Sequence, residues 1–420
     1  MTTATGARTP RIGAVLREGE RVTPLELFFD LVFVLAITQC TSLMSSHPTW
    51  EGLAQGVLVL GVLWWSWVGY AWLTSVVDPE EGAVRIVMFA AMAALLIVGI
   101  CVPQAFAGLA LEFALAYGAV RAAHIALFML ASRDDPALRR STVGLAFGTA
   151  IGVALLIAAS ALDGLAQAAV WALALLLDMG EPFLFGSEGW KLVPGHFAER
   201  HGLIVIIALG ESIVAIGVGA EAHLTVGIAT AAVLGVTVAA ALWWIYFDVV
   251  ALVSAQRLAR AEEGREQNEL ARDSYSYLHF LMVAGIVLAA LGLKKTLGDV
   301  EDPLGTVPAF ALLGGVALYL LGHVAFRLRH VRTISARRLL LALSLLAFLP
   351  AAVELPALAT LTMPAAVSSS LRRSSSPSRA TTRSAAERSS RTPPARGESS
   401  SRWPSSRLAS VTVASSPPRP

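Results

Sequence analysis

The amino-acid sequence predicts an all-α integral membrane protein, a polytopic bundle of transmembrane helices. Hydrophobic residues make up 55% of the chain and charged residues only 15%. The apolar residues gather in uniform runs of about 20, the length of a helix that crosses a bilayer, rather than in the one-sided pattern of a soluble helix. Every second connection between the runs carries Lys or Arg, which is typical of the cytoplasmic side of a membrane protein.

Eleven apolar runs are long enough to be spans. They cover residues 25–44, 53–75, 84–103, 106–131, 142–161, 164–186, 202–219, 224–250, 276–293, 307–326 and 337–358. The segment before the first run is basic, and the same alternation of charge continues to the last run, with Lys294-Lys295 on the outer side as the one exception. We therefore expect the N-terminus to lie in the cytoplasm.

Landmarks in the first half recur in the same order in the second. Carboxylates in the first and seventh spans are each followed by a tryptophan pair, Trp64-Trp65 and Trp243-Trp244. A histidine then stands in the fourth and tenth spans. This order predicts two parallel six-span pseudo-repeats. The predicted organisation is a cytoplasmic segment 1–22, a first repeat 23–190, a second repeat 191–366 with five evident spans, and a tail 367–420.

The tail is rich in Ser, Arg and Pro, a composition that buries too little apolar surface to order itself. The repeat calls for a twelfth helix at this place. We hypothesise that a shifted reading frame replaced that helix. Translating the other frames of the gene would test this, and a genuine disordered tail is the alternative.

The first span carries Glu26 and Asp30, four residues apart and so on one helix face. Ionisable groups inside a membrane span are costly and often mark an ion or proton pathway. We expect Asp30 to belong to such a pathway. Glu26 is a second candidate, or else the cap of a helix that begins after Thr23.

The seventh span carries Glu211 behind Gly210, where a carboxylate must be neutralised or paired. Arg200 and Glu211 are eleven residues apart, as are His201 and Ser212, so each pair shares a helix face. All four are candidates for a binding site or ion pathway. We expect Asp30 and Glu211 to form one asymmetric site between the repeats.

The fourth span carries Arg121 and His124 on one stripe, and they complete the set of candidates. An arginine deep in a membrane helix needs a carboxylate partner. The sequence offers Glu112, Asp30 and Glu211 for this role. A structural ion-pair network and a transport pathway are both compatible with these residues.

Signatures of soluble enzymes are missing from the sequence. It has no Walker loop, nucleophile elbow or Cys/His metal spacing. We expect no enzymatic activity, no metal and no cofactor. The expected partners are the lipid bilayer and an ion or small solute, not nucleic acid, and the oligomeric state is left open.

Two motifs carry a family resemblance. They are TPLELFFDLVFVLAITQ at residues 23–39 and HFAERHGLIVIIALGES at residues 196–212. Over roughly residues 20–358 the chain closely resembles the bacterial low temperature requirement A (LtrA) family. The resemblance implies a polytopic protein of the bacterial inner membrane, with a name that reflects growth in the cold. It supplies no catalytic residue.

Together these observations predict a membrane transporter for an ion or a proton-coupled small solute. The alternative is a non-transporting sensor, scaffold or stress-adaptation protein whose buried charges are structural.

Overall fold

The computed structural model of the protein describes residues 21–184, 189–220 and 224–375. Within these ranges the chain forms helices joined by short connections, and no strand is present. Ten of the described helical segments are long and apolar enough to cross a membrane. The predicted all-α polytopic bundle is therefore confirmed.

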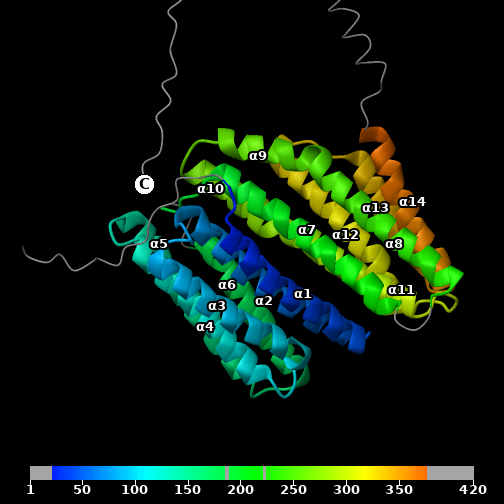
Figure 1. Ribbon diagram of the computed structural model, residues 1–420, viewed down its shortest axis with the longest axis horizontal. Helices are drawn as coiled ribbons and strands as arrows, with labels where there is room; N and C mark the ends of the chain where they lie inside the picture. The colour runs from blue at the N-terminus through cyan, green and yellow to red at the C-terminus, as the bar shows by residue number, and fades with distance from the viewer. Residues whose placement is uncertain (1–20, 185–188, 221–223, 376–420) are drawn as a thin grey trace, which may run out of the picture. The chain divides into compact units, whose positions relative to one another are not determined.

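Six long helices form the first half of the chain (Figure 1). They are α1 (Pro24–Ser46), α2 (Trp50–Val76), α3 (Gly82–Cys101), α4 (Ala110–Ala131), α5 (Pro136–Ala159) and α6 (Gly164–Leu184). Local chemistry sets where they begin. Thr23 and Glu26 form a reciprocal capping box at the start of α1. Asp135 caps the first turn of α5 ahead of a proline. Lys191 lies 2.6 Å from Asp135 and, with backbone N–H groups, lowers the pKa of that carboxyl.

The second half contains α7 (Pro194–Gly219) and α8 (Val226–Ile245), then a π-helical segment η2 (Tyr246–Val250) that leads into α9 (Ala251–Arg260). After α10 (Arg265–Ala271) a second π-helical segment, η3 (Arg272–Leu278), leads into α11 (His279–Gly298). The chain continues through α12 (Thr306–Val331), α13 (Ala336–Ala352) and α14 (Ala357–Ser375). The predicted spans at 224–250 and 276–293 are thus parts of longer helical segments, Val226–Arg260 and Arg265–Gly298.

The last predicted span, 337–358, is not a single membrane-length helix. It contains α13, which has 17 residues and ends at Ala352. Residues 353–356 then connect it to α14. The predicted tail boundary at 367 falls inside α14, which continues to Ser375. The remainder of the tail, and with it most of the frameshift hypothesis, lies outside the described residues.

Helix packing follows the same order in both halves. α1 packs on α2 and α3, as α7 packs on α8 and α11. The chain of contacts α3–α4–α5 corresponds to α11–α12–α13, and α6 packs on α2 and α5 as α14 packs on α8 and α13. This is the order that two pseudo-repeats predict, with α14 at the place of the twelfth helix. The division into repeats itself stays a prediction.

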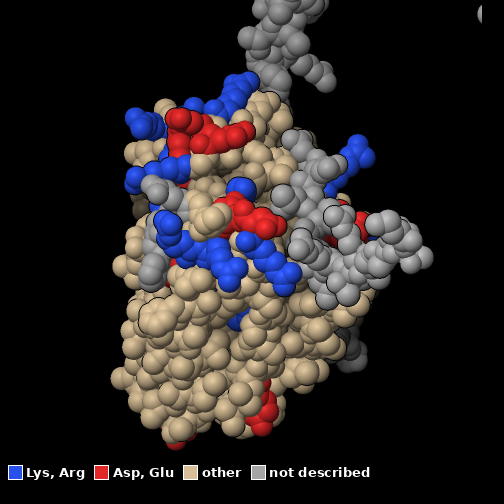
Figure 2. All heavy atoms as spheres, turned by 90° about the vertical axis from the view of Figure 1, so that its left-hand side faces the viewer, with Lys and Arg blue, Asp and Glu red and all other residues tan. Residues whose placement is uncertain are grey.

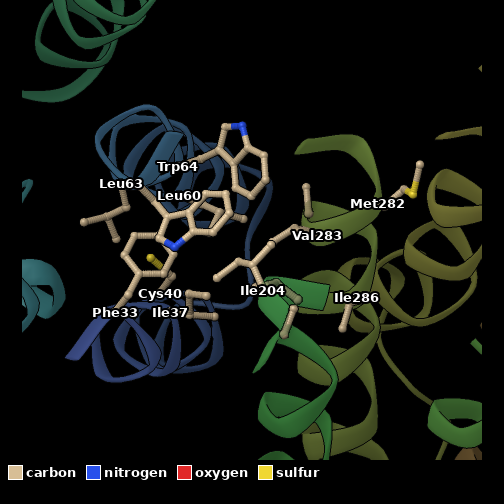
Figure 3. Close-up of a cluster of buried hydrophobic side chains, with 14 of the residues drawn as sticks. Phe33, Ile37, Cys40, Leu60, Leu63, Trp64, Ile204, Met282, Val283 and Ile286 are labelled. Carbon is tan, nitrogen blue, oxygen red and sulfur yellow. The ribbon is translucent and has the colours of Figure 1, made fainter. Parts of the chain in front are cut away.

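The two halves meet along α1, α2, α7 and α11, which contact one another across the boundary. Figure 3 shows the apolar side chains that fill this contact. They come from α1 (Phe33, Ile37, Cys40), α2 (Leu60, Leu63, Trp64), α7 (Ile204) and α11 (Met282, Val283, Ile286), and all are buried. Such close apolar packing is what associates helices where lipid offers no hydrophobic driving force.

The outer surface is largely apolar. Figure 2 shows one face on which Lys, Arg, Asp and Glu gather at one end, above a broad area that carries few charges. Large hydrophobic side chains are exposed on the outer helices, among them Ile86, Phe147 and Leu176. These surfaces fit contact with the lipid bilayer.

Candidate functional site

The two polar motifs meet where α1 packs on α7. Arg200 of α7 donates from Nη2 to Asp30 Oδ1 at 2.6 Å and from Nη1 to Glu26 Oε1 at 3.2 Å. His196, one turn earlier, donates from Nε2 to the same Glu26 oxygen at 2.8 Å. All four side chains are fully buried. A single guanidinium group therefore joins both carboxylates of the first motif.

Helix α2 completes this arrangement. Trp67 Nε1 donates to Asp30 Oδ1 at 2.9 Å, and the Arg200 guanidinium lies 5.4 Å from the Trp67 ring centre. Thr74 Oγ1 accepts a hydrogen bond from Arg200 Nη1 at 2.9 Å. We call these six residues the charged cluster: Glu26, Asp30, Trp67, Thr74, His196 and Arg200.

Glu26 caps α1, which was one of the two roles that the sequence offered for it, and also pairs with α7. Its Oε2 accepts from the backbone N–H of Thr23 at 2.8 Å and so caps α1, whereas its Oε1 faces α7. Although it caps a helix, its side chain is fully buried. Capping and pairing together hold the start of α1 against α7.

Glu211 lies at a second level of the same helix contact. The hydroxyl of Thr38 on α1 donates to Glu211 Oε2 at 2.5 Å. The residue is 2% exposed, and within the described ranges it forms no ion pair with a Lys, Arg or His side chain. A buried carboxyl held by a neutral hydroxyl can change its protonation without breaking an ion pair.

The structure does not bring Asp30 and Glu211 into one site. Asp30 is level with Arg200, which precedes Glu211 by eleven residues on α7. At about 1.5 Å of rise per residue, about 16 Å of helix separates the two levels. They share the α1–α7 contact but are separate places along it. Ser212, next to Glu211, is also buried.

Arg121 pairs with none of the carboxylates that the sequence suggested. Its Nη2 bonds Asp178 Oδ1 on α6 at 3.0 Å and Thr149 Oγ1 on α5 at 2.5 Å. Tyr117 on α4 also donates to Asp178, at 3.3 Å. Sequence spacing within one helix could not reveal this partner, because the pair joins different helices.

His124 lies one turn beyond Arg121, and its ring packs between those of Tyr70 and Phe128. Close contact with α2 depends on Gly69: a Cβ there would lie 2.8 Å from His124 Cε1. His201 is also buried, and its Nδ1 donates to the carbonyl of Phe197 at 2.8 Å. It packs in an aromatic cluster against the ring of His279, not with Ser212.

The two tryptophan pairs have different surroundings. Trp64 is fully buried, and its Nε1 donates to the carbonyl of Ser276 at 2.7 Å. Trp243 and Trp244 are 43% and 39% exposed. The first pair binds the two halves together, whereas the second faces outward. The tryptophan pairs therefore recur at matching places in the sequence but do not make matching contacts in the structure.

Residues that the sequence did not single out for the site are Trp67, Thr74, Thr38 and His196, which all contact a predicted site residue. His196 stands in the second motif, four residues before Arg200, so helical spacing could have placed both on one face. Among the described residues, no group of three or more His, Cys, Asp or Glu side chains could hold a metal ion.

The apolar helices and the charges buried between them define a polytopic integral membrane protein. Residues 21–371 match the family described as bacterial low temperature requirement A protein (LtrA). The chain is 32% identical over 311 residues to an uncharacterised protein of Rhizobium meliloti (strain 1021), which covers 71% of this chain and 75% of that protein. The chain belongs to the LtrA family, as its two motifs predicted. No solved structure matches it significantly.

Proposed function

We propose that the protein moves an ion or a proton-coupled small solute across the membrane, with Glu211 as the group that takes up and releases the proton or cation. The observation that carries this proposal is the setting of Glu211. It is buried well inside α7, bonded to the Thr38 hydroxyl, and not paired with a cation in the described part of the chain. A carboxyl group without a structural ion pair, kept inside a membrane helix, is by default a functional candidate.

The position of Glu211 supports the same proposal. It lies on the contact between α1 and α7, the first helices of the two predicted repeats. In transporters built from repeats, substrate and coupling-ion sites lie at the interface of the repeats. Movement of one half against the other would change the surroundings of the Thr38–Glu211 bond directly.

The charged cluster has a different role in this proposal. Its carboxylates Glu26 and Asp30 are held by Arg200 and by further donors, so a change of protonation there would break a buried ion pair. We assign the cluster to holding α1 against α7. The sequence predicted that Asp30 belongs to the ion pathway. In this proposal Asp30 instead joins α1 to α7 through its ion pair with Arg200.

We propose a location in the bacterial cell inner membrane with a cytoplasmic N-terminus. Family membership and the ten apolar helices support the membrane location. The orientation is supported by the basic connections before α5 and α7, which contain Arg133 and Lys191.

Reconstitution into liposomes tests the transport proposal. Internal pH and cation indicators would follow flux under imposed proton, Na⁺ and K⁺ gradients. We expect flux with the wild-type protein, loss of most of it in Glu211→Gln, and wild-type flux in the control Glu112→Gln, which alters an exposed carboxylate on α4. Folded wild-type protein without flux under every gradient would contradict transport, and unchanged flux in Glu211→Gln would contradict the role of that residue.

A second candidate is a non-transporting sensor or scaffold whose buried charges are structural. The complete burial and reciprocal pairing of the charged cluster favour it, because such networks can serve to fix one arrangement of helices. The same liposome experiment separates the two functions, since a scaffold yields no flux while all variants remain folded.

A further inference from the structure

A cavity of about 60 Å³ lies between helices of the first half and the segments α10 and η3 of the second, away from the α1–α7 contact. Residues of α2, α4, α5 and α6 line it, together with residues of α10, η3 and the connection before α7. None of the contacts described above for Glu211 or the charged cluster uses this space.

Arg121 presents free hydrogen-bond donors at the cavity wall. Only its Nη2 is bonded, to Asp178 and Thr149. Its Nε and Nη1 have no hydrogen-bond partner among the described residues, although the side chain is 1% exposed. A buried donor without an acceptor is costly, so these two groups point to an acceptor that a ligand would bring. Asp178 already balances the positive charge of Arg121. An acceptor that binds the two free N–H groups would therefore lie beside a neutral ion pair.

Glu181, which lines the same cavity, offers acceptor oxygens and lacks a donor from the described residues. It stands one turn after Asp178 on α6, is 3% exposed, and forms neither an ion pair nor a hydrogen bond within the described ranges. Its side chain packs on Gly148 of α5, where a Cβ would lie 3.2 Å from Glu181 Cγ. An acceptor-only carboxylate in this place calls for a cationic donor.

Aromatic rings form the rest of the wall. Trp65 and Trp72 of α2, Phe128 of α4 and Trp190 line the cavity, and Trp190 lies 5.1 Å from Phe128 between ring centres. Asn268 fixes Trp190 by donating to its carbonyl at 2.7 Å. Such rings bind an apolar body and attract a cation over their faces.

The π-helical segment η3 also contributes to the cavity. Ser276 lines it and accepts a hydrogen bond from Trp72 Nε1 at 3.0 Å. π-helical segments occur frequently at functional sites. The same segment leads into α11 of the second half, so an occupant of the cavity would touch both halves of the chain.

We propose that this cavity binds a zwitterionic amino acid with an apolar or aromatic side chain. Its carboxylate would accept from the free N–H groups of Arg121, its ammonium group would donate to Glu181, and its side chain would pack on the tryptophan rings. The proposal names the substrate class of the transporter and so rests on the proposed function. Binding is measured separately from flux, so a failure of this substrate class can be distinguished from a failure of the transport function.

The test uses the full-length protein in detergent and follows its tryptophan emission, because three tryptophans line the cavity. The ligands are L-phenylalanine and L-leucine, with phenethylamine and 3-phenylpropionate as analogues that lack the carboxylate or the amine. We expect saturable binding of at least one amino acid. Each analogue should bind about tenfold or more weakly than L-phenylalanine, since each loses one charged contact.

Two variants assign the contacts. Glu181→Gln breaks no ion pair and should weaken amino-acid binding about tenfold or more while leaving 3-phenylpropionate unchanged. Arg121→Lys keeps a cation beside Asp178 but loses the guanidinium donors, and should weaken amino acids more than phenethylamine. Glu112→Gln, which lies outside the cavity, should bind as the wild type does.

The proposal fails if neither amino acid binds at millimolar concentration, which would leave water as the occupant. It also fails if an analogue binds as tightly as L-phenylalanine, because the cavity would then select a simple cation or anion. Flux without amino-acid binding would retain the transport function and reject only this substrate class.

Discussion

Arg200 shows what a single residue contributes to the contact between the halves. Its planar guanidinium group reaches Glu26, Asp30 and Thr74 at once and lies over the Trp67 ring. A lysine could not make this set of contacts, because its ammonium group is a point charge without the fork geometry of arginine. The residue is therefore specific to its place and not merely a buried positive charge.

Replacing Arg200 with methionine should strongly destabilise the protein. The change leaves two carboxylates buried without their cation, and removing one partner of a buried ion pair costs about 3–5 kcal/mol. Thermal unfolding in detergent would measure the loss. The control is Lys191→Ala, which breaks a pair whose lysine side chain is 62% exposed and should cost about 1 kcal/mol or less. Equal stability of the two variants would contradict a structural role for the charged cluster.

Helices α11 and α12 illustrate packing at the scale of the element. Their backbones approach so closely that a Cβ on Gly285 would lie 2.6 Å from the carbonyl oxygen of Gly315. A Cβ on Gly315 would lie 2.5 Å from the backbone nitrogen of Ala289. Small residues at such crossings let membrane helices pack backbone to backbone. The pair forms a rigid part of the second half.

Gly315→Ala should destabilise the protein by about 1–3 kcal/mol, since the added methyl group forces backbone apart. The matched control is Gly217→Ala on the exposed face of α7, where a Cβ meets nothing within 4 Å. There alanine should be neutral or stabilise by up to about 1 kcal/mol through its higher helix propensity. Thermal unfolding compares the two, and a Gly315→Ala protein as stable as the control would reject the close contact.

Helix positions could be read from the sequence more reliably than helix ends. Long apolar runs identify spans because a bilayer admits only internally satisfied backbone. The seventh span was expected to begin at residue 202, yet α7 begins at Pro194. Hydropathy assigns His196 and Arg200 to a loop, but both are buried within the helix because Glu26 and Asp30 neutralise them.

The candidate site was predictable as a set of residues but not as a set of contacts. Sequence reasoning identified Glu26, Asp30, Arg200 and Glu211 because polar residues stand out in apolar runs. Which of these residues are in contact depends on how neighbouring helices are shifted along their axes. The spacing of residues within one helix gives no information about that shift. For the same reason the sequence missed Asp178 as the partner of Arg121.

At the scale of the whole molecule, the halves are related by their order of packing and differ in their polar contacts. The charged cluster takes its carboxylates from α1, and the side chains that bond them, Arg200 and His196, from α7. Arg121 and Glu181 of the cavity belong to the first half, and α10 and η3 of the second half complete its lining. We infer that both halves contribute to the proposed solute site and to the Glu211 contact.

The orientation of the whole molecule can be tested with single cysteines. Asp134 and Asp163 are exposed at opposite ends of α5, and the native Cys40 and Cys101 are buried. A membrane-impermeant maleimide applied to spheroplasts should label Asp163→Cys directly and Asp134→Cys only after permeabilisation. The reverse pattern would place the N-terminus outside the cytoplasm.

The central claim is that Glu211 exchanges a proton while Asp30 stays in its ion pair. Infrared difference spectra of the reconstituted protein between acidic and alkaline pH test it most directly, because a protonated carboxyl group has its own C=O band. We predict a pH-dependent carboxylic band in the wild type and in the Glu112→Gln control, with one component that is lost in Glu211→Gln. Wild-type and Glu211→Gln spectra that coincide in the carboxylic region would contradict the account.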